Sequence, residues 1–174
     1  MMFQKRKIIL LIFLLLILVS NCGYRFAGSG DFPEGAQKIF IPIFENRTSE
    51  SGLEKLITND VIYEFTRNRK DILAGSVDHA EAVLYGIIHS IGIETISRND
   101  PNTSTERSVR LSVDMKLVVP EGRVIWQVKG INSNEAYNVL PDNKYKTVQN
   151  RREAIAKLSQ RLAEKVYTRM TDNF

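Results

Sequence analysis

Residues 108–119 alternate between apolar and mostly polar side chains, and this pattern constrains the fold more than any other part of the chain. A period of two is typical of a β-strand with one buried and one solvent-facing side. A polar turn at residues 120–123 follows, and the run 124–131 then places Trp126 and Val128 on one face. The sequence therefore predicts an antiparallel hairpin. Its buried side comprises Val109, Leu111, Val113, Met115, Leu117 and Val119.

Residues 38–44 and 82–96 predict two earlier strands. In the first, Pro42 lacks an amide N–H and indicates a sheet edge or a bulge. In the second, Gly86 and Gly92 are candidate bulge positions. One face of this second strand is the more polar. The other carries the alternating set Val83, Tyr85, Ile87, Ile91 and Ile93.

Two amphipathic helices are predicted. Ser51 and Glu54 match the S-x-x-E capping box, and the helix that they open should run to about Lys70. Asn150 and Glu153 form a second cap-like pair before a helix at the carboxyl end. The apolar stripe of the first helix comprises Leu53, Leu56, Ile57, Val61 and Phe65. That of the second comprises Ile155, Leu158, Leu162, Val166 and Met170.

The connections between these elements set the fold class. Residues 98–107 and 132–147 are polar and are predicted as loops, the second of them a long excursion. The resulting order, β-α-β-β-β-α, predicts an α+β fold in one domain. We expect a two-layer α/β sandwich, with a four-stranded mixed sheet and both helices on one of its faces.

The amino-terminal segment has the pattern of an exported lipoprotein. Basic residues at positions 5–7 precede the apolar run 8–19. At ~1.5 Å per residue this run is too short to cross a hydrocarbon core of ~30 Å. The sequence before Cys22 resembles a lipobox, with Asn21 in place of the usual Gly or Ala. The alternatives are an ordinary signal peptide and an uncleaved anchor.

This pattern predicts three segments: a signal peptide at residues 1–21, a lipidated tether at 22–37 and a single α/β domain at 38–174. Cys22 is the only cysteine, so no intramolecular disulfide can form and the core must hold the domain together. Acyl chains on Cys22 would anchor the protein to a membrane. Gly23 replaces the Asp that favours inner-membrane retention, and it predicts the outer membrane of a Gram-negative cell.

Charge argues against a nucleic-acid partner. The formal net charge of +4 includes three basic residues of the predicted signal peptide, so the remainder carries 21 basic and 20 acidic residues. These charges are scattered along the sequence, whereas a nucleic-acid-binding protein presents a clustered basic face.

The sequence offers few residues that could act in catalysis. After lipidation no free thiol is left, and the chain has only two histidines, His79 and His89. His89 lies in a predicted strand, where a surface or hydrogen-bonded imidazole is the simpler interpretation. Asp78, His79 and Glu81 match no metal-ligand spacing. We therefore predict no enzyme activity, no metal and no cofactor.

The sheet face without helices is free for a partner or a ligand. Arg110, Asp114 and Lys116 occupy alternate polar positions on it. It is either a merely solvated face or an interaction surface. In the second case Arg98, Arg107 and Arg110 are available for bidentate contacts to phosphate.

Several short motifs, in this order behind a lipobox, resemble one family over nearly the whole mature chain. They are CGYRF at residues 22–26, IPIFENRT at 41–48, GLE at 52–54, AEAVLYG at 80–86, and Trp126 near the start of the last strand. The fourth departs from the usual pattern, because Glu81 replaces an Asp. This set is similar to that of the lipopolysaccharide-assembly lipoprotein family LptE.

The resemblance implies a small α/β sandwich and a non-enzymatic role. It implies an outer-membrane lipoprotein that sits in the lumen of the LptD β-barrel, assists its assembly and helps deliver lipopolysaccharide to the outer leaflet. No motif of the family identifies the lipopolysaccharide contacts. From charge and strand position we select Arg98, Arg107, Arg110 and Lys129 as candidate contacts to lipid A phosphates.

Two other functions remain open. Residues 44–48 followed by a helix also resemble CsgG-like and TolB amino-terminal domains, which serve secretion or envelope complexes. Against this, the chain has one small domain and neither pore-forming hairpins nor a propeller. A stand-alone lipid- or peptidoglycan-binding module is the other alternative.

Overall fold

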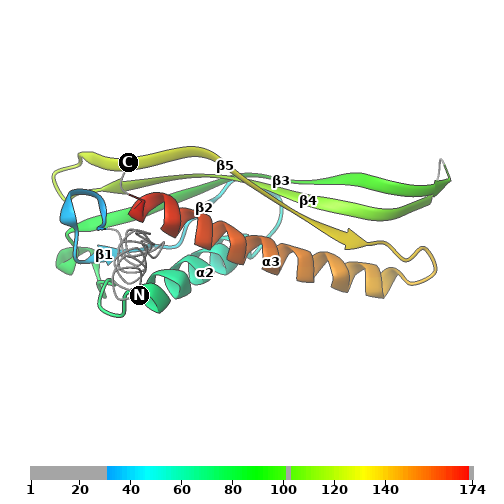
Figure 1. The fold of residues 1–174 in the computed structure, drawn as a ribbon, viewed down its shortest axis with the longest axis horizontal. Coiled ribbons are helices and arrows are strands. Elements are labelled where there is room, and N and C mark those ends of the chain that lie inside the picture. Colours follow the sequence, from blue (N-terminus) through cyan, green and yellow to red (C-terminus); the bar gives the residue numbers. More distant parts are fainter. Residues whose placement is uncertain (1–30, 101–102, 173–174) are drawn as a thin grey trace, which may run out of the picture.

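A long, twisted sheet and two helices on one of its faces make up the fold (Figure 1). The computed structural model describes residues 31–100 and 103–172. The predicted α+β class is confirmed, with a mixed sheet of five strands instead of four. Its elements are η1 (Pro33–Gly35), β1 (Ile39–Phe40), β2 (Glu45–Asn46), α2 (Leu53–Asn68), η2 (Val77–His79), β3 (Ala82–Asp100), β4 (Thr103–Val118), β5 (Val124–Asn138) and α3 (Lys144–Thr171).

The extra strand arises because the first predicted strand is interrupted. β1 and β2 both pair with β3 in parallel, and they flank Pro42 at the edge of the sheet. Between them, the backbone N–H of Phe44 donates to Thr58 Oγ1 of α2 at 3.0 Å. This segment therefore bonds to the helix, and the Phe44 side chain is buried beneath the sheet.

Both predicted polar loops are largely wrong. β3 continues to Asp100 and β4 begins at Thr103, so residues 98–100 and 103–107 form the outer part of an antiparallel pair of strands. Likewise β5 extends to Asn138 and α3 begins at Lys144. Strand pairing uses backbone groups, so polar side chains can occupy a strand wherever no core demands apolar ones.

The predicted bulges at Gly86 and Gly92 are also wrong. The register of β3 against β4 shifts between Ile88 and Ser90, which makes His89 the extra residue. This bulge moves the apolar set from one face to the other: Tyr85 lies on the face without helices, whereas Ile91 is paired with the buried Leu111. A single alternating pattern therefore does not describe β3.

Gly86 has a packing role instead. A Cβ atom at this position would lie 2.7 Å from the ring of Phe44, whereas one at Gly92 would meet nothing within 4 Å. Only glycine leaves room for the aromatic ring to lie against the β3 backbone.

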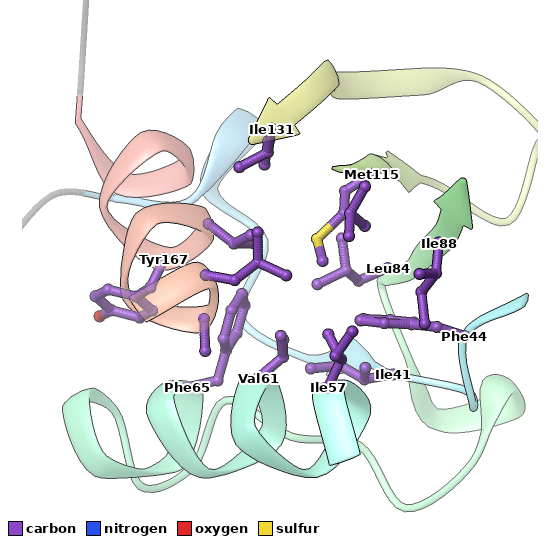
Figure 2. Packing of buried hydrophobic residues seen from close by; sticks show 14 of the residues in the cluster. Ile41, Phe44, Ile57, Val61, Phe65, Leu84, Ile88, Met115, Ile131 and Tyr167 are labelled. Carbon is purple, nitrogen blue, oxygen red and sulfur yellow. The ribbon is translucent and has the colours of Figure 1, made fainter. Parts of the chain in front are cut away.

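The predicted helix stripes form the core (Figure 2). Ile57 and Val61 of α2 point toward Leu84 of β3, whereas Phe65 lies against Tyr167 of α3. In α2 only Leu56 of the predicted stripe is less than fully buried. All of the predicted α3 stripe is buried: Ile155, Leu158, Leu162, Val166 and Met170.

The predicted caps are one residue or more out of place. Gly52, at φ 90°, is the N-cap of α2, so Ser51 lies outside the cap, while the Glu54 carboxylate accepts from the Gly52 N–H at 3.2 Å. Asn143 caps α3 by accepting from the Lys146 N–H at 2.9 Å. Asn150, the predicted cap, lies within α3 and donates to the carbonyl of Asn138 at 2.9 Å.

The first described residues pack onto the helices. Phe32 is buried and lies against Phe65 of α2 and Tyr167 of α3, with ring centroids 5.6 and 5.9 Å apart. In the sequence, Cys22, the predicted lipidation site, precedes Phe32 by ten residues.

Candidate functional site on the outer face of the sheet

The face of the sheet opposite the helices, here called the outer face, is the candidate functional surface. Leu111 and Met115 of β4 are buried toward the helices, so Arg110, Asp114 and Lys116 face outward as the alternation predicts. The side chains of Tyr85, Lys116 and Gln127 form one row across it, because these residues are register partners in β3, β4 and β5.

The four predicted phosphate-binding cations do not meet in one site. Arg110 lies on the outer face, where its Nη2 donates to Glu94 Oε2 at 2.8 Å. Lys129 lies in β5 opposite Asp114, whereas Arg107 alternates onto the side of the buried Val109. Arg98 pairs far along the hairpin, with Ser104. From the Ser104 level to the Asp114 level is roughly 33 Å at ~3.3 Å per residue.

Asp114 makes two contacts with neighbouring strands on the outer face. Its Oδ1 accepts from the Gly130 backbone N–H at 2.7 Å, and its Oδ2 lies 3.0 Å from His89 Nε2. Both partners are at bulges, because the β4–β5 register shifts between Val113 and Met115 and Gly130 has φ 62°. Asp114 therefore joins an irregularity in β3 to one in β5.

The electrostatics of Asp114 follow from these contacts. The Gly130 N–H, with a smaller contribution from His89, lowers the pKa of the Asp114 carboxyl below its ordinary value. The carboxylate therefore stays ionised, and its oxygens are already occupied by partners within the chain. Lys116 is held differently, with its Nζ 5.6 Å from the centre of the Tyr85 ring.

The histidines have hydrogen-bonding partners. His89 contacts Asp114, as its satisfied-imidazole interpretation requires, and His79 Nδ1 lies 2.9 Å from Ser76 Oγ. Glu81 accepts from the Gln37 backbone N–H at 2.6 Å. Within residues 31–100 and 103–172, no group of three or more His, Cys, Asp or Glu side chains is arranged to hold a metal ion.

The ENRT part of the 41–48 motif shapes the connection from β2 to α2. Asn46 Nδ2 donates to the Glu50 carbonyl and to Glu54 Oε2, at 2.9 and 2.8 Å. Its Oδ1 accepts from Thr48 N and Thr48 Oγ1 at 3.0 and 2.8 Å. One amide side chain thus fixes the turn, so this motif is explained by structure without any ligand.

Glu50, held at the end of this turn, binds α3. Arg151 donates to both of its carboxylate oxygens, at 2.9 and 2.6 Å. This bidentate contact lowers the pKa of Glu50 and raises that of Arg151. The ion pair fastens the α2 entry to the long helix. Sequence patterns could not predict this ion pair, because Glu50 and Arg151 are 101 residues apart in the chain.

The predicted lipidation site, Cys22, lies outside the described residues. Of the helices in the described part of the chain, none has the length and apolar character needed to cross a bilayer.

Known proteins share both the sequence pattern and the fold of this chain. The sequence matches the family model LptE, described as lipopolysaccharide-assembly, over residues 36–170. Rare lipoprotein B from Shewanella oneidensis has a similar structure, with a TM-score of 0.53 at 14% identity over 76% of this chain and 92% of that one. Lipoprotein B from Nitrosomonas europaea aligns with a TM-score of 0.58 at 10% identity, covering 86% and 90%. At such identities the structural likeness shows the fold alone. No curated protein matches the sequence.

Proposed function

Because this chain belongs to the LptE family, we propose that it is a non-catalytic lipoprotein of lipopolysaccharide assembly in a Gram-negative envelope. The observation that supports this most is the extent of the family match. Residues 36–170 include all of the described strands, α2, and α3 except its last residue, Thr171. The shared unit is thus the whole α/β domain and not a short motif.

The mature protein would be anchored in the outer membrane. Cleavage after residue 21 and acylation of Cys22 would leave residues 22–37 to connect the anchor to the domain at 38–174. The buried Phe32 fixes the domain end of this connection, so the span available between the acyl chains and the packed domain is ten residues. At ~3.4 Å per residue the β1 end of the sheet would lie within roughly 34 Å of the membrane.

The partner would be an LptD-type outer-membrane β-barrel, with this domain in its lumen, where it would assist barrel assembly and lipopolysaccharide export. The barrel lumen of such proteins is polar, which suits the charged outer face. Arg98, Arg107, Arg110 and Lys129 would each contact lipopolysaccharide phosphates at a separate place on three strands, with Arg107 and Arg110 on opposite faces of the sheet.

The partner is tested by mild-detergent purification of the lipidated protein from native outer membranes, followed by mass spectrometry. We expect one large β-barrel in equal stoichiometry. Rings of the chain alone would favour the pore-type alternative, and bait alone would favour a stand-alone binder. Cys22→Ala should abolish lipid labelling and leave the domain folded. Retained labelling would contradict acylation at Cys22.

The cations are tested by replacing Arg98, Arg107, Arg110 and Lys129 together with Gln, with lipopolysaccharide binding and export as readouts. We expect both to fall. The matched control replaces four exposed helix lysines by Gln, which changes the net charge equally: Lys55, Lys144, Lys146 and Lys157. Equal effects in the two quadruple variants would reduce the proposal to general electrostatics, and unchanged binding would refute it.

A further inference from the structure

The outer face has a small hollow beside the Asp114 contacts. Its volume is about 180 Å³. Side chains from three neighbouring strands line it, and the rows of the sheet place most of them on the outer face. Those on the outer face are Tyr85, Ile87, Asp114, Lys116, Gln127 and Lys129, and Met115 and Val128 complete the lining.

The polar groups of the hollow are mainly donors. Asp114 brings the one carboxylate, and its oxygens are engaged by Gly130 and His89. That leaves the ammonium groups of Lys116 and Lys129, the amide of Gln127 and the hydroxyl of Tyr85 facing solvent. A group that completes this set must supply anionic oxygen, since ammonium groups can only donate.

The walls of the hollow are apolar. Ile87 is half-buried and Tyr85 is 42% exposed, so aromatic and aliphatic surface lies next to the two ammonium groups. The complementary chemistry is therefore an anionic oxygen beside an apolar group.

The volume of the hollow indicates whether a small molecule or a protein side chain supplies this anionic oxygen. Sites that enclose a whole small molecule occupy ~300–1,000 Å³. The hollow, at about 180 Å³, has room for one or two protein side chains. Within residues 31–100 and 103–172, both long helices lie on the other face of the sheet, so the hollow is accessible to another folded surface.

We propose that this hollow receives an Asp or Glu side chain, adjacent to an apolar residue, from a protein that docks on the outer face. Lys116 holds the carboxylate, and Tyr85 with Ile87 packs against the apolar neighbour. The bulge at Gly130, fixed by Asp114, positions Lys129 at the rim. The proposal deepens the proposed function by naming the surface for its protein partner, and it rests on that function only for the existence of such a partner.

The test uses photocross-linking in native outer membranes. A benzophenone amino acid replaces Gln127 at the rim of the hollow in the full lipoprotein, and the cross-linked peptide is mapped. Lys116 is the residue chosen for substitution because it is not one of the proposed phosphate contacts. We expect a protein cross-link whose mapped peptide contains Asp or Glu, reduced at least about tenfold by Lys116→Glu and retained with Lys116→Arg.

A charge swap completes the design. Changing the mapped partner carboxylate to Lys should restore the cross-link to the Lys116→Glu protein. Lys157→Glu, on the exposed side of α3, is the matched control and should leave the yield unchanged. Circular dichroism verifies that each variant is folded.

Three results would overturn the proposal: a cross-link only to lipopolysaccharide, no cross-link, or a yield that ignores the charge at position 116. If a barrel still copurifies with the unaltered protein in those cases, the proposed function stands and only the docking surface is refuted. If no barrel copurifies, the proposed function fails, whereas a charge-dependent protein cross-link would still support the docking surface.

Discussion

The two halves of β3 differ in what holds them in place. The covered half, residues 82–88, packs on α2 and contributes Ala82, Leu84 and Ile88 to the core, each 0% exposed. The open half, residues 92–98, is exposed throughout, and even Ile93 and Ile96 are 47% and 56% exposed. Length explains the difference: β3 spans about 63 Å at ~3.3 Å per residue, whereas α2 spans about 24 Å at ~1.5 Å per residue.

The comparison teaches that one continuous strand can be under two different constraints. The covered half must fit a volume shared with α2, so its side chains are restricted in size. The open half is held mainly by pairing with β4, so packing against a helix does not restrict the size of its side chains. Four stability measurements test this division, in order of decreasing expected effect.

Phe65→Ala should have the largest effect. The ring is 0% exposed and lies against Phe32 and Tyr167, so its removal leaves a cavity and should lower the free energy of unfolding by about 3–5 kcal/mol. Ile93→Ala in the open half is the control and should cost under about 1 kcal/mol. Urea denaturation monitored by circular dichroism measures both. Similar losses would mean that the open half is covered in solution.

Gly86→Ala and Gly92→Ala form a matched pair, one in each half. The added methyl group at Gly86 would meet the Phe44 ring at 2.7 Å, and we expect a loss of about 1–3 kcal/mol. At Gly92 nothing lies within 4 Å, so the change should stay within about 0.5 kcal/mol. Thermal melting of the two variants measures the contrast, and a harmless Gly86→Ala would show that Phe44 is free to move aside.

Glu50→Gln tests the ion pair between Glu50 and Arg151. This pair lies near the junction of the two halves of β3, because the turn that leads to Glu50 is hydrogen-bonded there: the Arg47 N–H donates to the Ile88 carbonyl. We expect a loss of about 1 kcal/mol at neutral pH from an incompletely exposed pair. The pKa of Glu50 is lowered from 4.5 in the folded state, so the unfolded chain binds a proton first as the pH falls. Its contribution is therefore present above pH 4.5 and is lost below it.

The pH dependence of the Glu50→Gln variant provides the control. Denaturation at several pH values should show that the difference between variant and unaltered protein is constant near neutrality and shrinks below pH 4.5. A difference that grows with acid would mean that the pair does not stabilise the fold.

Arg110→Gln should have the smallest effect. Its ion pair with Glu94 of the open half is 58% and 57% exposed, and such pairs contribute under about 0.5 kcal/mol on average. The change should be detectable only at low salt. A loss above 1 kcal/mol in urea denaturation would contradict the view that the open half carries little of the stability.

Sequence patterns predicted the parts of the fold that touch the core. The alternation at residues 108–119 gave β4 its buried face, and both helix stripes were correct in type and in nearly every member. The same method missed the outer end of the β3–β4 hairpin, where residues 94–98 are exposed and carry no apolar alternation. It also missed residues 132–138 of β5, because Ser133 is one of the two buried residues on their covered side and does not read as apolar; Tyr137 is the other. Pro42 correctly indicated an edge, but the break into β1 and β2 depends on Thr58 of α2.

The candidate site was predicted less completely. Arg110, Asp114 and Lys116 were placed on the free face, as the structure has them. The link from Asp114 to His89 and Gly130 was not, because it depends on where three strands shift register. The wide separation of Arg98, Arg107, Arg110 and Lys129 was also missed, because the segment that holds Arg98 and Arg107 was predicted as a loop and is extended strand instead.

The sequence by itself determined the class of the fold, the core and the family. The fold class and the core follow from apolar residues that recur with the period of a helix or a strand, and the family follows from short motifs in a fixed order. Tertiary structure alone decided the length of the hairpins, the bulges at His89 and Gly130, and the hollow beside Lys116. Those features result from backbone pairing and hydrogen bonds between distant residues, which need no particular local pattern.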